Sequence, residues 1–116
     1  MQIYVKISIV KSPGIPFMGS GPLRLLGKIR KHKSINKAAT SMNLSYVKAL
    51  KMLNRLEECL DRRMLVRTRG GNKRGGAQLT PHAEKYIDHY VELQQSIADF
   101  AQKEFQKFEE KLQKED

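Results

Sequence analysis

Residues 34–60 read SINKAATSMNLSYVKALKMLNRLEECL, and this stretch decides the fold. Ser34 and Ser45 each stand where a helix can begin, because a serine hydroxyl accepts a hydrogen bond from a first-turn backbone N–H. Asn43 tolerates the left-handed backbone conformation that ends a helix. The stretch therefore predicts two helices joined by a tight turn at Asn43, the second running to about Leu60.

Both predicted helices have one apolar side. Its residues recur at steps of three and four, namely Ile35, Ala38, Ala39 and Met42 in the first helix and Ala49, Leu50, Leu53 and Leu56 in the second. The small side chains of Ala38 and Ala39 let the two helices cross closely. Such a pair is typical of a helix-turn-helix, although taken alone it also fits a plain helical hairpin.

The segment that follows favours the helix-turn-helix. Residues 64–69 predict a strand, residues 70–76 (GGNKRGG) form a glycine-rich basic loop, and residues 77–79 predict a returning strand. This is the pattern of a β-hairpin wing with a cationic tip. A nucleotide phosphate loop also uses glycines, but it needs a Ser or Thr directly after the lysine and a helix directly after the loop. The sequence has neither.

The flanks complete the predicted architecture. Residues 2–9 alternate between apolar and polar side chains, which predicts a half-buried β-strand, and residues 15–18 predict a short return strand. A helix should begin at Pro22 and end near Lys33, and a last helix, capped by Thr80, should run to about residue 114. The fold class is α+β, mostly α: a winged helix-turn-helix with an N-terminal β-strand, a basic wing and a long C-terminal helix.

The charge is distributed unevenly over the chain, whose net charge is +10. Residues 1–56 hold 11 Lys or Arg and no Asp or Glu, and residues 1–83 hold 17 basic and 3 acidic side chains. Residues 84–116 hold 5 basic and 9 acidic ones. A basic region joined to an acidic tail indicates a polyanionic partner, and we expect double-stranded DNA. The alternatives are a solvated lysine surface, or a membrane surface, for which the sequence lacks an amphipathic basic helix and a lipid anchor.

The contact residues follow from the helix-turn-helix, whose second helix lies in the major groove of DNA. The side of that helix opposite its apolar residues, together with its first turn, presents Ser45, Tyr46, Val47, Lys48, Lys51, Met52 and Arg55. Ser34 and Thr40 of the preceding helix are expected at phosphates. The wing should follow phosphates or enter the minor groove with its basic residues, Arg67, Arg69, Lys73 and Arg74.

The last helix is longer than a domain of this size can cover. Its apolar residues recur at steps of three and four as Tyr90, Leu93, Ile97, Ala101, Phe105, Phe108 and Leu112. Such a stripe predicts a homodimer with a second copy of the chain, and a frayed, solvated tail is the alternative. We therefore divide the chain into a DNA-binding domain, residues 1–82, and a dimerisation helix, residues 83–116.

The combination of these motifs resembles the DNA-binding domain of the ModE family, the molybdate-responsive bacterial regulators, and more distantly the LysR-type domain. The resemblance covers about residues 3–95 and is carried by Gly21-Pro22-Leu23-Arg24-Leu25-Leu26, Ser34-Ile35, Ala38-Ala39, Leu44-Ser45-Tyr46, Gly70-Gly71 with Gly75-Gly76, and Leu79-Thr80-Pro81. The family usually has Gly in place of Asn43 and Trp in place of Leu50. Its full-length members continue into oxyanion-binding domains. The resemblance thus implies DNA binding and dimerisation, and it does not imply molybdate sensing.

Other classes of function have little support in the sequence. The histidines (His32, His82 and His89) have no metal-ligand spacing, the single Cys59 excludes an intrachain disulfide, and no hydrolase or metalloprotease motif occurs. We expect no enzyme, no metal and no cofactor, and a cytoplasmic protein without a membrane span. A sequence-indifferent architectural protein that binds DNA or RNA through the same basic face remains the alternative. The sequence identifies no small-molecule effector.

Overall fold

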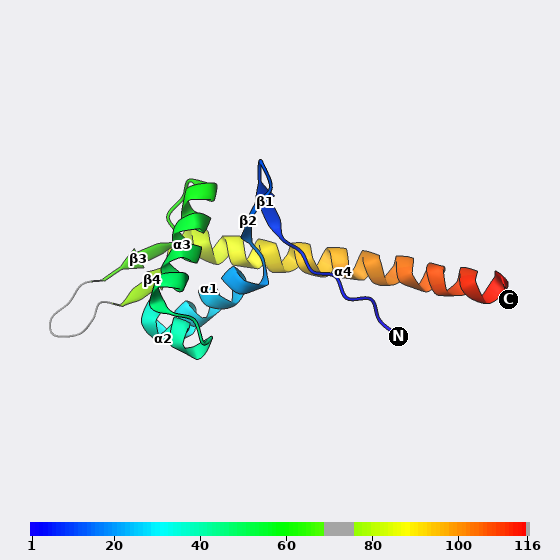
Figure 1. Cartoon of the computed structure of the whole chain (residues 1–116), viewed down its shortest axis with the longest axis horizontal. Coiled ribbons are helices and arrows are strands. Elements are labelled where there is room, and N and C mark those ends of the chain that lie inside the picture. Colours follow the sequence, from blue (N-terminus) through cyan, green and yellow to red (C-terminus); the bar gives the residue numbers. More distant parts are fainter. Residues whose placement is uncertain (69–75, 116) are drawn as a thin grey trace.

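Four helices and two β-hairpins make up the part of the chain that the computed structural model describes, residues 1–68 and 76–115. In chain order they are β1 Ile9–Lys11, β2 Ile15–Met18, α1 Ser20–His32, α2 Ile35–Ser41, α3 Tyr46–Leu60, β3 Leu65–Arg67, β4 Ala77–Leu79 and α4 Pro81–Glu115. The other elements gather around the first turns of α4, and the rest of α4 extends away from them (Figure 1). The molecule therefore measures 70 × 29 × 24 Å. The predicted winged helix-turn-helix is confirmed.

The helix-turn-helix is closed by local hydrogen bonds. Ser34 Oγ accepts a bond from the third backbone N–H that follows it, at 3.1 Å, and Ser45 Oγ does the same at the start of α3, also at 3.1 Å. Asn43 has a φ of 56°, in the left-handed region. The backbone N–H of Leu44 donates to Ala39 O at 2.9 Å. Both predicted caps and the predicted turn are confirmed.

The core lies where α1, α2, α3 and the start of α4 meet. Three alanines occupy the crossing of α2 and α3 with almost no exposed surface, namely Ala38, Ala39 and Ala49. Side chains this small let the two helices approach closely enough to exclude water. The larger core residues from these helices are Leu25, Leu26, Ile29, Leu53, Leu56, Ile87 and Tyr90. Leu50, predicted to face inward, packs against this core and is partly buried.

The wing strands, β3 and β4, pair antiparallel with Leu65 opposite Leu79. The backbone N–H of Ala77 donates to Lys33 O at 3.0 Å, which ties β4 to the end of α1. The wing is therefore held to the helical core at its base. The predictions for Arg69, Lys73 and Arg74 lie outside the described residues.

The N-terminal segment differs from the predicted strand. Residues 1–8 form no strand, and β1 begins only at Ile9, as the first half of a separate two-stranded hairpin. The segment runs instead beside α4, where Tyr90 Oη donates to Ile7 O at 3.0 Å and the N–H of Ile3 donates to Gln102 Oε1 at 3.2 Å. We call residues 1–8 the N-terminal arm. Within residues 1–68 and 76–115 no strand pairs with this arm, and its bonds to other elements run to α4.

The first helix begins two residues earlier than predicted, at Ser20. Pro22 is thus its third residue, a position where a missing backbone N–H costs no intrahelical hydrogen bond. The predicted end is confirmed, since Lys33 closes α1 with a φ of 55°. At its other side α1 is joined to α4 by an ion pair between Arg30 and Glu84.

Candidate nucleic-acid interface

The outer face of α3 presents most of the residues predicted to contact DNA. Val47 is 59% exposed and Tyr46 is 43% exposed, and the capping residue Ser45 is exposed as well. The three basic residues of this helix are exposed: Lys48, Lys51 and Arg55. Met52 differs, because its side chain is partly buried and packs against the core. The face is therefore polar and cationic, with Met52 at its edge.

The charges on this face are uncompensated. Within the described ranges, none of the α3 cations takes part in an ion pair. The first turn of α3 contains no acidic residue, so the positive end of the helix dipole adds to the same field. Acidic side chains enter α3 only in its last turn, at Glu57 and Glu58. Glu57 is engaged there, because its Oε2 accepts a bond from the N–H of Met64 at 2.8 Å.

The other predicted contact residues stand on two neighbouring elements. Ser34 is half-buried at the start of α2, with its oxygen committed to the cap, and its hydroxyl hydrogen remains available for donation. Thr40 is exposed in the last turn of α2. Arg67 is exposed at the end of β3, beside the start of the wing loop.

Sequence reasoning omitted one polar residue of this surface. Asn54 is exposed on α3, three residues after Lys51 and seven after Val47. Helical spacing of three and seven residues places it on the same side as both. This spacing could have identified Asn54 as a contact residue from the sequence.

The apolar stripe of α4 divides into a covered part and an exposed part. Tyr90 is 3% exposed because the core of its own chain and the N-terminal arm cover it, so it offers a partner little surface. Ala101 and Phe105 are half-buried beyond it. The exposed members of the predicted stripe are Leu93, Ile97, Phe108 and Leu112, and Phe100, which the stripe omitted, is also exposed.

The described part of the molecule shows neither a metal-ligand cluster nor a helix that could span a membrane. Over residues 1–68 and 76–115, no three His, Cys, Asp or Glu side chains come together in a group suited to a metal ion. None of the helices described combines the length and the apolar character that a bilayer crossing requires.

Comparison with known proteins places this geometry in a family. The model of the family described as "Bacterial regulatory helix-turn-helix protein, lysR family" matches residues 22–84, which is more than half of the chain. The chain belongs to this LysR family. The matched region runs from the first turn of α1 through the wing to the start of α4. The N-terminal arm, the β1–β2 hairpin and most of α4 lie outside the LysR-family match.

Two curated relatives carry the name ModE. The Transcriptional regulator ModE of Haemophilus influenzae is 34% identical over 80 residues, which are 69% of this chain and 31% of that protein. The Molybdenum transport protein ModE of Azotobacter vinelandii is 33% identical over 72 residues, 62% of this chain and 27% of that protein. The resemblance to the ModE family is confirmed. The chain spans less than a third of the length of these relatives.

Solved structures show the same fold. The crystal structure of the BenM DBD in a complex with benA site 1 DNA superposes with a TM-score of 0.52 at 20% identity, covering 70% of this chain and 85% of that one. The BenM DBD with catB site 1 DNA gives a TM-score of 0.52 at 20% identity, covering 70% and 84%. A likeness at this level of identity shows the fold alone.

Proposed function

We propose that this protein is a DNA-binding transcriptional regulator that reads specific sequences of duplex DNA with α3 in the major groove. The positive charge on the outer face of α3 carries the proposal. No ion pair among the described residues neutralises it, so it is available to bind a polyanion. Membership of the LysR family and the DNA in the neighbouring structures support duplex DNA as the partner.

The residues divide by the part of DNA that each would meet. Ser45, Tyr46 and Lys48 stand at the end of α3 that meets base edges in helix-turn-helix proteins. Lys51, Met52 and Arg55 follow further along the groove, near Val47. Asn54 carries a donor and an acceptor on one amide, the pair that matches an adenine edge. Ser34 and Thr40 would hold phosphates, and the wing residues Arg67, Arg69, Lys73 and Arg74 would follow phosphates or enter the minor groove.

Two substitutions distinguish contacts with bases from contacts with phosphates. Lys48→Ala should change the preferred sequence in a selection from random duplexes. Arg67→Ala should weaken binding to all duplexes alike and lower the slope of log K against log salt by about 0.9. Lys103→Ala, an exposed lysine of distal α4, is the matched control and should change neither.

The same experiment tests the alternative of a sequence-indifferent architectural protein. Selection should yield a defined sequence, and an excess of scrambled duplex should compete poorly with it. Competition by scrambled duplex at equal strength would favour the architectural role. Parental DNA binding by both variants would overturn the proposed placement of the interface.

We further propose that the protein acts as a homodimer through α4, with residues 1–82 as the DNA-binding part and residues 83–116 as the dimerisation helix. The exposed apolar residues of α4 support this, because water disfavours an uncovered stripe of this kind. Two copies would present two α3 helices to half-sites about 10 base pairs, or a multiple, apart.

Full-length variants test the dimer. Leu93→Lys with Ile97→Lys should convert a dimer to a monomer in size-exclusion chromatography with light scattering, with little loss of stability, since both side chains are already exposed. Val91→Lys is the matched control: it is 47% exposed but lies roughly 120° around the helix from Ile97. A parent that is monomeric, or a double variant that stays dimeric, would overturn this interface.

A further inference from the structure

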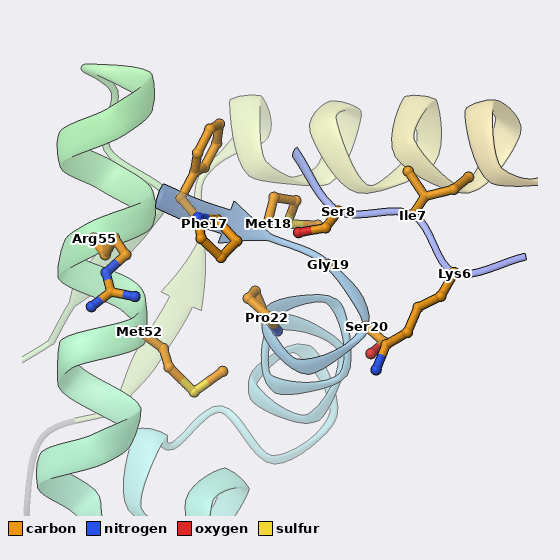
Figure 2. Close-up of a pocket in the computed structure, with 11 residues that line it drawn as sticks. Lys6, Ile7, Ser8, Phe17, Met18, Gly19, Ser20, Pro22, Met52 and Arg55 are labelled. Atoms are coloured by element: carbon orange, nitrogen blue, oxygen red, sulfur yellow. The ribbon is translucent and has the colours of Figure 1, made fainter. Parts of the chain in front are cut away.

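A cavity of about 410 Å³ lies between α3, the start of α1, β2 and the N-terminal arm. Its lining residues include Phe17 and Met18 from β2, Pro22 from α1 and Met52 from α3 (Figure 2). Phe17 and Met18 are almost fully buried, at 8% and 1% exposure, so this wall is part of the core. A volume of this size falls within the range of small-molecule sites, roughly 300–1,000 Å³.

Two cations stand at the edge of this apolar space. Arg55 reaches it from α3 and Lys6 from the N-terminal arm, on opposite sides (Figure 2). No acidic side chain lines the cavity. Neither cation forms an ion pair with any residue in the ranges 1–68 and 76–115. The cavity thus combines an apolar interior with unneutralised positive charge.

We propose that this cavity binds a small organic anion, a carboxylate with an apolar body. The body would lie against Pro16, Pro22 and Met52, the apolar lining residues that keep exposed surface, where it displaces water. The carboxylate would meet Arg55, whose planar guanidinium can donate two parallel hydrogen bonds to it, and Lys6, on the opposite side, adds only a longer-range attraction. A bare inorganic anion would leave the apolar walls unfilled, so the walls favour an organic ligand.

The site shares one residue with the proposed DNA interface. Arg55 lines the cavity and also stands on the exposed face of α3. A carboxylate that holds Arg55 withdraws this cation from phosphates. We therefore infer, on the basis of the proposed function, that the ligand and DNA compete and that the ligand lowers the affinity for DNA.

Binding is tested first without DNA, on the full chain, by calorimetry and by amide NMR shifts. The probe is 3-phenylpropionate, compared with its neutral amide and with inorganic phosphate. We expect saturable binding of the carboxylate, with shifts at residues 6–8, 17–20 and 52–55, and at least tenfold weaker binding of the amide and of phosphate. Arg55→Gln should weaken probe binding at least fivefold, and Lys6→Gln should weaken it by a smaller factor.

The control is Lys51→Gln, since Lys51 is an exposed cation one turn before Arg55 that does not line the cavity. It should leave probe binding unchanged. The proposal is overturned if the amide binds as well as the carboxylate, if Lys51→Gln weakens binding as much as Arg55→Gln does, or if the shifts fall on α4.

Competition is tested second, at constant ionic strength. Probe at ten times its dissociation constant should raise the apparent Kd for DNA about tenfold. If the probe binds without changing the affinity for DNA, the proposed competition through Arg55 is wrong, while the proposed binding site stands. If the chain binds the probe but no duplex DNA, the proposed DNA-binding function is wrong, and the proposed carboxylate site again stands.

Discussion

Ser45 caps α3 and also stands at the end of α3 that is proposed to enter the major groove. Its Oγ accepts a hydrogen bond from the backbone N–H of Lys48 at 3.1 Å. Aspartate at this position keeps an acceptor for that N–H and places a negative charge at the positive end of the helix. We predict that Ser45→Asp preserves the fold and weakens DNA binding.

The two effects differ in sign and can be estimated. For folding, Ser45→Asp should leave the free energy of unfolding unchanged or raise it by about 0.3–1 kcal/mol, whereas Ser45→Ala should lower it by about 1 kcal/mol. For binding, a carboxylate about 6 Å from a phosphate is repelled by about 0.7 kcal/mol in water and about 2.8 kcal/mol at an effective dielectric constant of about 20. This corresponds to a loss of about 3-fold to 100-fold in affinity.

Urea unfolding measures the first quantity, and fluorescence anisotropy with a labelled duplex measures the second. Ser96→Asp is the control, because Ser96 is exposed on α4 and its substitution lowers the net charge by the same single unit. It should reduce DNA affinity much less. Parental affinity in Ser45→Asp would refute the placement of this helix end at DNA, and a loss of stability equal to that of Ser45→Ala would refute the cap argument.

Three further predictions concern the fold. Ala39→Leu should lower the free energy of unfolding by about 1–3 kcal/mol in urea titrations, because Ala39 is 1% exposed at the crossing of α2 and α3; parental stability would contradict that packing. Tyr90→Phe should cost about 1 kcal/mol and speed hydrogen exchange of the Ile3 amide, since the hydroxyl bond to Ile7 O holds the N-terminal arm. Burial raises the pKa of Tyr90 above its ordinary value of 10.0. The unfolded chain therefore loses this proton first, so stability should fall as pH rises above about 10, less steeply in Tyr90→Phe; an equal fall in both would show that Tyr90 is not the source.

The short-range features of the protein could be predicted from the sequence. The caps at Ser34 and Ser45 and the left-handed Asn43 depend on atoms within a few residues of each other, so local chemistry decides them. Their spacing relative to the wing strands then specified the winged helix-turn-helix. The exposed cations of α3 followed from helical periodicity once the apolar side was known.

Features that join distant segments could not be predicted in this way. The alternation in residues 2–9 correctly marked Val5, Ile7 and Ile9 as half-buried, whereas Ile3 is 43% exposed. The partner of this segment was taken to be a strand, and residues 3 and 7 bond to α4 instead. For the same reason Tyr90, a member of a regular stripe, is covered by its own chain. Periodicity identifies an apolar side without identifying what covers it.

The sequence by itself determined the order of the helices and of the wing strands, the face of α3 that carries charge, and the separation of basic and acidic regions. Each of these depends on residue type and on spacing along one helix or turn. Only the tertiary structure decided where the N-terminal arm docks, and that Lys6, Met18 and Arg55 line one cavity. These residues are far apart in the chain, and their proximity results from helix packing that no local pattern encodes.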